Sequence, residues 1–251
     1  LGGLNNTQVF DVIDMGSIKY TVNGAVARAS LLSQKNVTSI VDGGMIAADS
    51  FIATFRTTTT NETITLPLQA AGVYAGFIDW GGVGISGLSY ADRAFTFPVA
   101  GDHVIKIYGQ CEGWSFHGNT TNAKILEISN WGAEFRLGPY INNFYNCSNL
   151  DITATDTLNL TGSTQLTQTF RGCTSLVWNS SVNNWDVSGI YGMTGMFRGC
   201  TLFNQDLDDW DVSNCSVFAN MFSYGSQHAG NINNWQFPPG TNLQYMFTGN
   251  N

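Results

Sequence analysis

Few residues in this chain combine the types and the spacing that catalysis requires. Three histidines occur, at His103, His117 and His228. None has a Ser or Cys nucleophile beside it in a motif such as G-x-S-x-G, so nucleophilic catalysis is disfavoured. A glycosidase needs two carboxyl groups that face each other across a cleft, and nothing marks Glu112, Glu127 and Glu134 as convergent. We therefore expect no enzyme activity, and a carbohydrate-active domain ranks only as a third hypothesis.

An acidic cluster surrounds Trp210. It consists of Asp206, Asp208, Asp209 and Asp211. Carboxylate oxygens suit calcium, but this run lacks the D-x-D-x-D-G loop, and Asp206 and Asp211 recur in a repeat pattern. An Asp at a turn commonly accepts hydrogen bonds from backbone amides. We favour this capping role over a calcium site and expect no metal.

Three of the five cysteines each follow a phenylalanine by three residues. They are Cys147, Cys173 and Cys200, with steps of 26 and 27, and they should stack in one column. A metal site or a disulfide is one interpretation, and a column of small buried thiols is the other. Zinc sites favour C-x-x-C pairs, which are absent, so we favour buried thiols and expect no cofactor. Cys111 and Cys215 lie outside the column, and no even-numbered disulfide framework is evident.

A glycine-rich motif follows a strand-like run. Residues Gly82-Val83-Gly84-Ile85-Ser86-Gly87 fit G-x-G-x-x-G. A dinucleotide site needs a helix immediately after this motif, to place amides and the helix dipole on the pyrophosphate. The residues that follow, 88–93, lead instead into another β-like run. We therefore favour a loop between strands.

The elements that position these residues follow from a repeat. Phenylalanine returns with steps of 26, 27, 25 and 25, at Phe144, Phe170, Phe197, Phe222 and Phe247. A second column lies 12 or 13 residues earlier, at Trp131, Leu158, Trp185, Trp210 and Trp235. A period of about 20 to 29 residues indicates a leucine-rich-repeat solenoid, whose coils bury their apolar residues only against neighbouring coils. We predict about five coils of 25–27 residues, with the Phe, Trp and Cys columns as the structural ladder.

Short motifs recur within this repeat. W-D-V-S occurs at 185–188 and 210–213, M-x-x-M-F at 193–197 and F-N-Q at 203–205. These residues resemble the BspA-like leucine-rich repeat of bacterial surface proteins, which also occurs in phage virion proteins. The resemblance covers roughly residues 140–251 and implies a solenoid without naming a ligand. It is looser in the early coils, where Leu158 replaces Trp.

Residues 49–110 alternate as short β-strands do between glycine-rich turns. Strand-like runs occur at 51–55, 62–68, 76–81, 93–97 and 103–108. Strands at this spacing indicate a β-sandwich. Asp79-Trp80-Gly81, and Phe97 followed by Ala100-Gly101 and Ile105, resemble the PKD-like immunoglobulin-type module. The resemblance implies a domain that spaces or presents others on extracellular proteins. The fold class is thus mainly β, a PKD-like sandwich followed by a short solenoid.

Two further segments complete the predicted organisation. In residues 1–48 we expect strands at 10–13 and 18–22 and a short helix over 25–35. This segment is either an N-terminal docking segment, packed on another subunit or domain, or a mobile leader. Residues 111–131 would begin the solenoid domain, 111–251, as its N-terminal cap, because an uncapped first coil exposes its apolar end.

The composition limits the partners. Charged residues make up 11% of the 251 residues, the net charge is −8, and the ten Lys and Arg residues are scattered singly. A nucleic-acid groove needs clustered cations, so that partner is disfavoured. No apolar run approaches the ~20 residues of a membrane span. Low charge with many small neutral polar residues suits an extracellular, cell-surface or virion location.

These observations favour a non-enzymatic surface protein that presents a repeat-built surface for adhesion or recognition of a cell-surface glycan or protein. Phe247 begins a coil that the sequence leaves unfinished, so either the native chain continues or another subunit covers that face. The alternative is a structural subunit of a phage fibre, virion or extracellular filament. Such a subunit would self-assemble into an oligomer or polymer through residues 1–48 and the open C-terminal coil.

Overall fold

The computed structural model describes residues 13–14, 40–41, 50–225 and 230–250. Within residues 1–48, β1 (Ile13–Asp14) and β2 (Ile40–Val41) pair in parallel with each other. The strand expected at 18–22 and the helix expected at 25–35 lie outside the described residues. The docking segment therefore stays a prediction.

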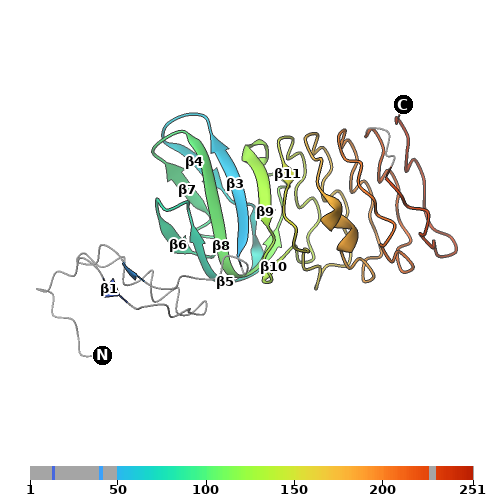
Figure 1. Cartoon of the computed structure of the whole chain (residues 1–251), viewed down its shortest axis with the longest axis horizontal. Helices are drawn as coiled ribbons and strands as arrows, with labels where there is room; N and C mark the ends of the chain where they lie inside the picture. The colour runs from blue at the N-terminus through green and yellow to red at the C-terminus, as the bar shows by residue number, and fades with distance from the viewer. Residues whose placement is uncertain (1–12, 15–39, 42–49, 226–229, 251) are drawn as a thin grey trace, which may run out of the picture.

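A sheet of seven strands holds the N-terminal half of the described chain together (Figure 1). Six strands lie across it in the order β11-β9-β3-β8-β5-β6, and β10 pairs with β8. Their bounds are Phe51–Thr57 (β3), Leu68–Asp79 (β5), Ile85–Gly87 (β6), Gly101–Trp114 (β8), Ile125–Asn130 (β9), Phe135–Arg136 (β10) and Asp151–Ile152 (β11). The β10–β8 and β11–β9 pairs are parallel, and the other pairs are antiparallel.

A second, two-stranded sheet pairs β4 (Glu62–Thr65) with β7 (Ala94–Phe97). In β3, Phe51, Ala53 and Phe55 are buried and the residues between them are less so, which is the alternation of a strand with one face in a core. Ile64 and Phe97 of the smaller sheet belong to the same cluster of buried hydrophobic residues as these three. The two sheets therefore share one core.

Two features of these strands differ from the expected pattern. The run expected as one strand at 62–68 is divided between β4 and β5, because Pro67 between them has no N–H to donate to a ladder. β8 continues across the boundary expected between residues 110 and 111, and Cys111 and Trp114 are both fully buried there. The division into domains at that boundary stays a prediction.

From β10 onward the chain runs in coils that lie side by side toward the C-terminus (Figure 1). We call residues 135–250 the coil stack. Parallel bridges join neighbouring coils, along the row Gln165, Gly192, Val217 and Asn242. Backbone amides also donate to the following coil, for example from Phe197 N to Met221 O at 2.9 Å. Backbone hydrogen bonds between successive turns of the chain therefore hold the stack together.

Each coil turns at two corners where the backbone is left-handed. At the first corner φ lies between 55° and 59°, at Asn142, Gln168, Gly195, Asn220 and Tyr245. At the second corner φ lies between 55° and 78°, at Asn146, Gly172, Gly199, Tyr224 and Gly249. Asn and Gly adopt this region more readily than other residues. Both corners recur at the period of the Phe column, so each forms a column of its own.

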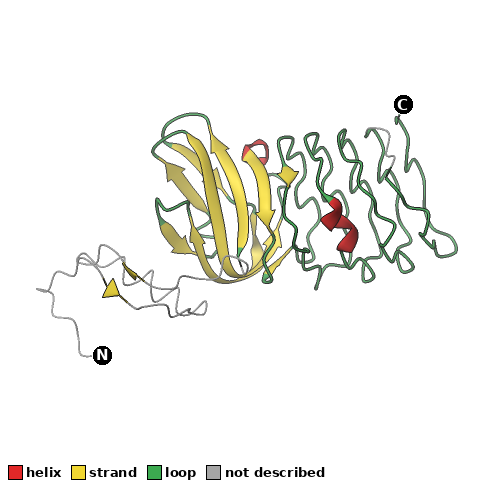
Figure 2. Cartoon of the chain, viewed as in Figure 1, coloured by secondary structure: helices red, strands yellow, loops and turns green. Residues whose placement is uncertain are grey.

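The expectation of a mainly β protein is confirmed. The helices of the described residues are two short 3-10 turns, η2 (Asn122–Lys124) and η3 (Ser180–Asn184). Figure 2 shows that the strands gather in the sheet, whereas the coils consist mainly of turns and loops. In the described part of the chain, no helix has the length and apolar character to cross a membrane.

Candidate functional site

The phenylalanine column lies in the core of the coil stack. Neighbouring rings are nearly parallel, at 2° to 8°, with centroids 5.3 to 5.8 Å apart, in the pairs Phe144–Phe170, Phe170–Phe197, Phe197–Phe222 and Phe222–Phe247. The first four rings are buried, and Phe247 in the last coil is 45% exposed. Since each ring covers its neighbour, the column is a packing element.

The tryptophan column is regular only in the later coils. Trp185, Trp210 and Trp235 stack at 6.5 and 6.1 Å with planes 11° and 6° apart. Trp131 instead meets Trp185 edge-on, at 76° and 5.8 Å, because Leu158 stands in the coil between them. The indole N–H groups of Trp210 and Trp235 donate to backbone carbonyls of the preceding coil, at 2.8 and 2.7 Å.

The cysteine column consists of buried, free thiols. Cys173 Sγ donates to the carbonyl of Phe144 at 3.0 Å, and Cys200 Sγ donates to that of Phe170 at 2.9 Å. Burial raises the pKa of both thiols, so they remain neutral donors. Cys147 has the same place one coil earlier. Among the residues that the structure describes, no group of three His, Cys, Asp or Glu side chains could hold a metal ion.

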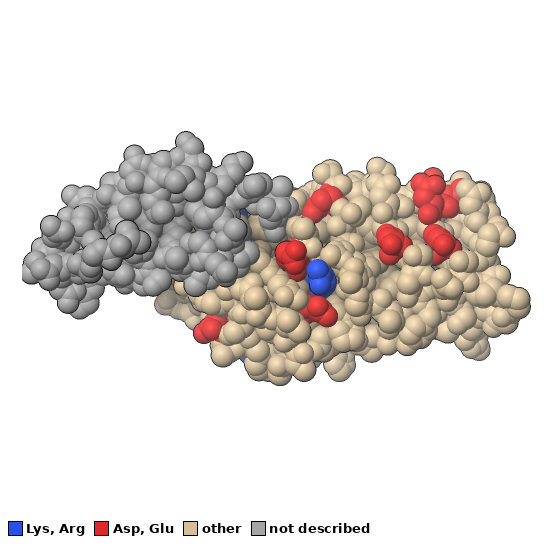
Figure 3. All heavy atoms as spheres, turned by 90° about the horizontal axis from the view of Figure 1, so that it is seen from below, with Lys and Arg blue, Asp and Glu red and all other residues tan. Residues whose placement is uncertain are grey.

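The aspartates around Trp210 hold backbone and side-chain groups of neighbouring residues. Asp206 accepts from the amide of Asn231, and Asp208 accepts from the amide of Asn234 at 2.7 Å. The side chain of Ser213 lowers the pKa of Asp211, whose carboxylate also accepts from the Ser213 amide at 3.0 Å. Figure 3 shows acidic side chains on the coil-stack end of the molecule and others on the part that carries the sheets. Asp211 thus caps its own turn, as expected, whereas Asp206 and Asp208 bond to amides of the following coil.

Aspartates elsewhere in the stack have similar partners. Asp151 Oδ1 accepts from the amides of Val177 and Trp178 in the next coil, at 3.0 and 2.8 Å. Asp156 accepts from the amides of Trp131 and Gly132 in the preceding coil. These carboxylates connect neighbouring coils, so their positions in the sequence are explained by the repeat and require no ligand.

The glycine-rich motif forms a hairpin between β5 and β6. Asp79 Oδ1 accepts from Gly82 N at 2.9 Å, and Trp80 N donates to Gly84 O at 2.9 Å. The residues after Gly87 form turns that lead into β7. The motif therefore does not precede a helix, as a dinucleotide site requires.

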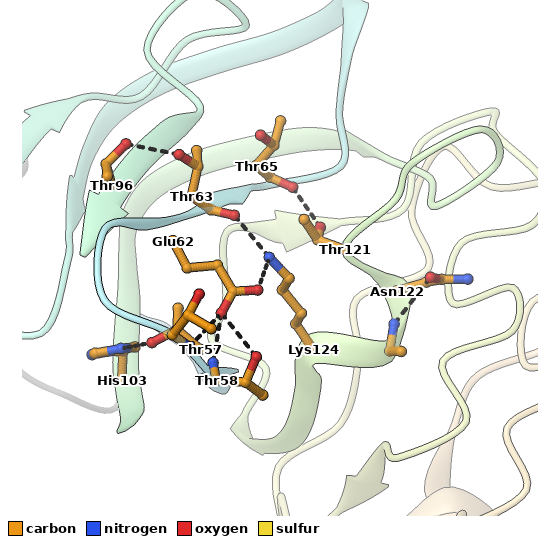
Figure 4. A network of polar contacts seen from close by, with 12 residues as sticks. Thr57, Thr58, Glu62, Thr63, Thr65, Thr96, His103, Thr121, Asn122 and Lys124 are labelled. Atoms are coloured by element: carbon orange, nitrogen blue, oxygen red, sulfur yellow. Dashed lines mark hydrogen bonds and ion pairs between the residues drawn. The ribbon is translucent and has the colours of Figure 1, made fainter. Parts of the chain in front are cut away.

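A charged clasp between Glu62 and Lys124 ties β4 to the turn η2, immediately before β9 (Figure 4). Glu62 pairs with Lys124 at 2.8 Å and accepts from the amide of Thr59 at 3.1 Å, while Lys124 Nζ donates to the carbonyl of Thr63 at 3.0 Å. The hydrogen bond from Lys124, followed by those from the amides of Thr58 and Thr59, lowers the pKa of Glu62 to about 2. Because the charged groups of the clasp bond to other groups of the protein, we interpret it as a structural contact.

Two of the three histidines, His103 and His117, lie in the described residues, in different surroundings. The ring of His103 stacks on Phe97 at 3.7 Å, and its Nε2 lies 2.8 Å from the hydroxyl of Thr57. His117 lines a cavity of about 340 Å³ together with Arg93 and Tyr90. His228 lies outside the described residues. A second cavity, of about 600 Å³, is bordered by two coils and has one carboxylate, Asp186, in its lining.

Three tyrosines of the coil stack are more than half exposed. Tyr191, Tyr224 and Tyr245 are 51%, 54% and 58% exposed. Trp178, like these tyrosines, lies outside the regular columns of the repeat, which predicts exposure. For Trp178 this prediction is wrong, because the ring is buried and meets the ring of Phe170 edge-on at 5.0 Å. The structure places Tyr224 and Tyr245 at the two left-handed corners.

Two arginines that the sequence analysis did not single out lie at the second corner. Arg171 and Arg198 precede Gly172 and Gly199, and both are partly buried. The guanidinium carbon of Arg171 lies 5.4 Å from the ring centroid of Tyr145, and that of Arg198 lies 5.0 Å from that of Tyr224. The 27-residue step between the two arginines equals the step between Phe170 and Phe197, so the repeat could have revealed them.

Comparison with known proteins finds a match only for the C-terminal part of the chain. Residues 140–251 match the model of a family described as "Mycoplasma protein of unknown function, DUF285". The match covers the coil stack from Tyr140 onward, and of the strands in the two sheets it includes only β11. No curated protein and no solved structure matches the chain significantly.

Proposed function

We propose that the chain is a non-enzymatic extracellular or virion-surface protein whose coil stack presents a surface for adhesion or recognition. In this proposal the coil stack is a BspA-like leucine-rich-repeat solenoid, and the two sheets are a PKD-like, immunoglobulin-type module that supports it. The stacked Phe rings and the 25–27-residue spacing support the solenoid assignment. The continuous core from Phe51 to Met246 supports rigid presentation.

The exposed tyrosines at the corners carry the binding proposal. Tyr224 and Tyr245 are more than half exposed, although both are held in the left-handed region, where a large side chain is disfavoured. Aromatic side chains on a stiff framework can bind with little loss of conformational freedom. Avidity would multiply weak contacts if many copies were arrayed on one surface.

A direct test measures binding of the purified chain to glycan arrays and to intact cells. A variant with Tyr191→Ser, Tyr224→Ser and Tyr245→Ser should lose most of the signal. Tyr90→Ser is the matched control, because Tyr90 is 41% exposed on the sheet part of the chain. The adhesion proposal fails if the native chain binds neither surface, or if the triple variant binds as well as the control.

A structural subunit is the second candidate function. It is supported by a row of backbone N–H groups in the last coil that have no hydrogen-bond acceptor in the described residues. Within the described residues, the backbone N–H groups of Leu243, Tyr245, Phe247 and Gly249 meet no acceptor, whereas their equivalents in the preceding coil, Phe218, Asn220, Phe222 and Tyr224, donate to that last coil. A further strand could add at this edge. A coil continuing the same chain would use the same donors, so self-association is the distinguishing property.

Light scattering and negative-stain microscopy test this candidate. The subunit hypothesis expects oligomers or filaments, and Phe247→Asp should reduce them by placing a charge beside the open edge. A uniform monomer at high concentration would leave adhesion as the preferred function.

A further inference from the structure

Arg171 and Arg198 form an isolated pair of cations on the coil stack. They are the only Lys or Arg residues after Arg136 in the sequence. The amide of Gly172, which follows Arg171, donates to the carbonyl of Arg198 at 2.8 Å. The two side chains therefore start from neighbouring backbone rows, which lie about 4.8 Å apart when joined by such bonds. We propose that this pair binds the carboxylate or sulfate groups of an acidic glycan.

Tyrosines flank the pair on both sides. Tyr145 lies in the coil before Arg171, and Tyr224 lies in the coil after Arg198. A guanidinium group that stacks on an aromatic ring keeps its N–H edge available for hydrogen bonding. The order Tyr145, Arg171, Arg198, Tyr224 thus holds two forks of donors next to each other, with an aromatic face at each end.

Neither arginine has a carboxylate partner in the described part of the chain. The ion pairs found there, Arg56–Asp102, Lys124–Glu62 and Arg136–Glu134, all lie outside the second-corner column. Arg171 Nη1 donates to the neutral amide oxygen of Gln168 at 3.2 Å. Two neighbouring positive charges without a counter-charge repel each other, and a guanidinium fork pairs best with a planar or tetrahedral oxyanion. An external anion that bridges both would remove the repulsion.

The surroundings favour a glycan as the carrier of this anion. A nucleic acid needs many phosphate contacts, whereas the coil stack has only these two cations after Arg136, in a chain of net charge −8. The same corner column carries exposed Tyr224 and the exposed amide side chain of Asn146. Aromatic rings can pack against a sugar and neutral amides can form hydrogen bonds with it, while the two arginines bind the widely spaced acidic groups of the glycan. This inference rests on the proposed adhesive function and names its ligand class.

Calorimetry with matched ligands tests the proposal. The probes are an oligogalacturonide, its fully methyl-esterified neutral form, a sulfated dextran, an unsulfated dextran of equal length, and inorganic sulfate alone. The native chain should bind at least one acidic glycan about tenfold or more tightly than its neutral counterpart, and added salt should weaken this binding. Binding of inorganic sulfate as tight as that of the acidic glycans would show a simple anion site and overturn the glycan assignment.

Variants separate this site from general charge effects. Arg171→Gln with Arg198→Gln should abolish the preference for the acidic ligand, while Arg171→Lys should keep the charge but lose part of the affinity. Lys106→Gln makes a single charge change in β8 and should bind like the native chain. An unchanged preference in the double variant, with a native circular dichroism spectrum, overturns the inference. Binding of neutral glycans alone, insensitive to these changes, would overturn it and leave the adhesive function standing.

Discussion

The rings of Phe170 and Phe197 lie 5.7 Å apart with their planes 7° from parallel, although 27 residues separate them in the sequence. Phe197 has the same relationship to Phe222 on its other side, at 5.8 Å and 8°. A ring in the middle of the column is therefore covered by a column neighbour on both sides, and Phe197 also stacks on Phe203 at 4.1 Å. A ring in the last coil has one such partner, because Phe247 meets only Phe222 within the described residues.

Truncating a central ring should therefore cost far more than truncating the last one. We expect Phe197→Ala to lower the free energy of unfolding by about 3–5 kcal/mol, since it leaves a cavity between two coils. Phe247→Ala should cost about 1 kcal/mol or less, because that ring is partly in water already. Urea denaturation followed by tryptophan fluorescence measures both. Equal losses would mean that the column is not the packing element of the stack.

The repeat could be read from the sequence because every coil must place the same residue type in the same column. The Phe, Cys and later Trp columns could therefore be predicted from residue spacing alone. The edge-on packing of Trp131 against Trp185 could not be predicted, because it results from the smaller Leu158 in the coil between them. The burial of Trp178 could not be predicted either. Its backbone is left-handed, with φ 59°, and its ring lies in the core although it has no counterpart in the other coils.

The partners of the charged groups were also difficult to predict from the sequence. An Asp beside a turn predicts a capping bond, but its partner is often an amide of the neighbouring coil, as with Asp151 and Trp178. Such a pairing depends on the register of the coils. The clasp between Glu62 and Lys124 joins residues 62 positions apart through no repeat at all, so sequence spacing could not indicate it. Arg171 and Arg198 were within reach, since they share the period of the Phe column.

Acid should weaken the Glu62–Lys124 clasp. The pKa of Glu62 is lowered to about 2, mainly by the hydrogen bond from Lys124, whereas an unfolded Glu titrates near about 4.3. The contribution of Glu62 to stability is therefore complete above the unfolded pKa and declines as the pH falls from about 5 toward 2. The difference in melting temperature between the native chain and Glu62→Gln should shrink over this range. A difference that is constant with pH would contradict the clasp.

The cysteine thiols should be unreactive in the folded protein. Burial raises the pKa of Cys173 and Cys200 and, outside the column, that of Cys215 to about 11. Since the thiolate is the reactive form, we expect negligible labelling by a thiol reagent at neutral pH. All five thiols should react after unfolding in guanidinium chloride. Rapid labelling of the native chain would show that the coils open.

The second corner should tolerate asparagine better than alanine. Gly199 has φ 74°, and a Cβ there would meet Gly172 only at an ordinary contact distance of 3.8 Å. The cost of Gly199→Ala is therefore conformational, and we expect about 1 kcal/mol. Gly199→Asn should cost less, because Asn adopts this region more readily and already occupies the equivalent corner at Asn146. Thermal denaturation of the two variants checks the order, and a more stable alanine variant would contradict it.

The sheets and the coil stack should unfold together. Phe51 of β3 stacks on Phe135 of β10 at 4.1 Å and also contacts Trp114 and Trp131 at 5.2 and 6.2 Å. This cluster belongs to a core that continues into the coils, so neither part has a separate interior. We expect one calorimetric transition, and Phe51→Ala should lower its midpoint without dividing it. Two transitions, of which only the first responds to Phe51→Ala, would instead establish the independent domains that the sequence suggested.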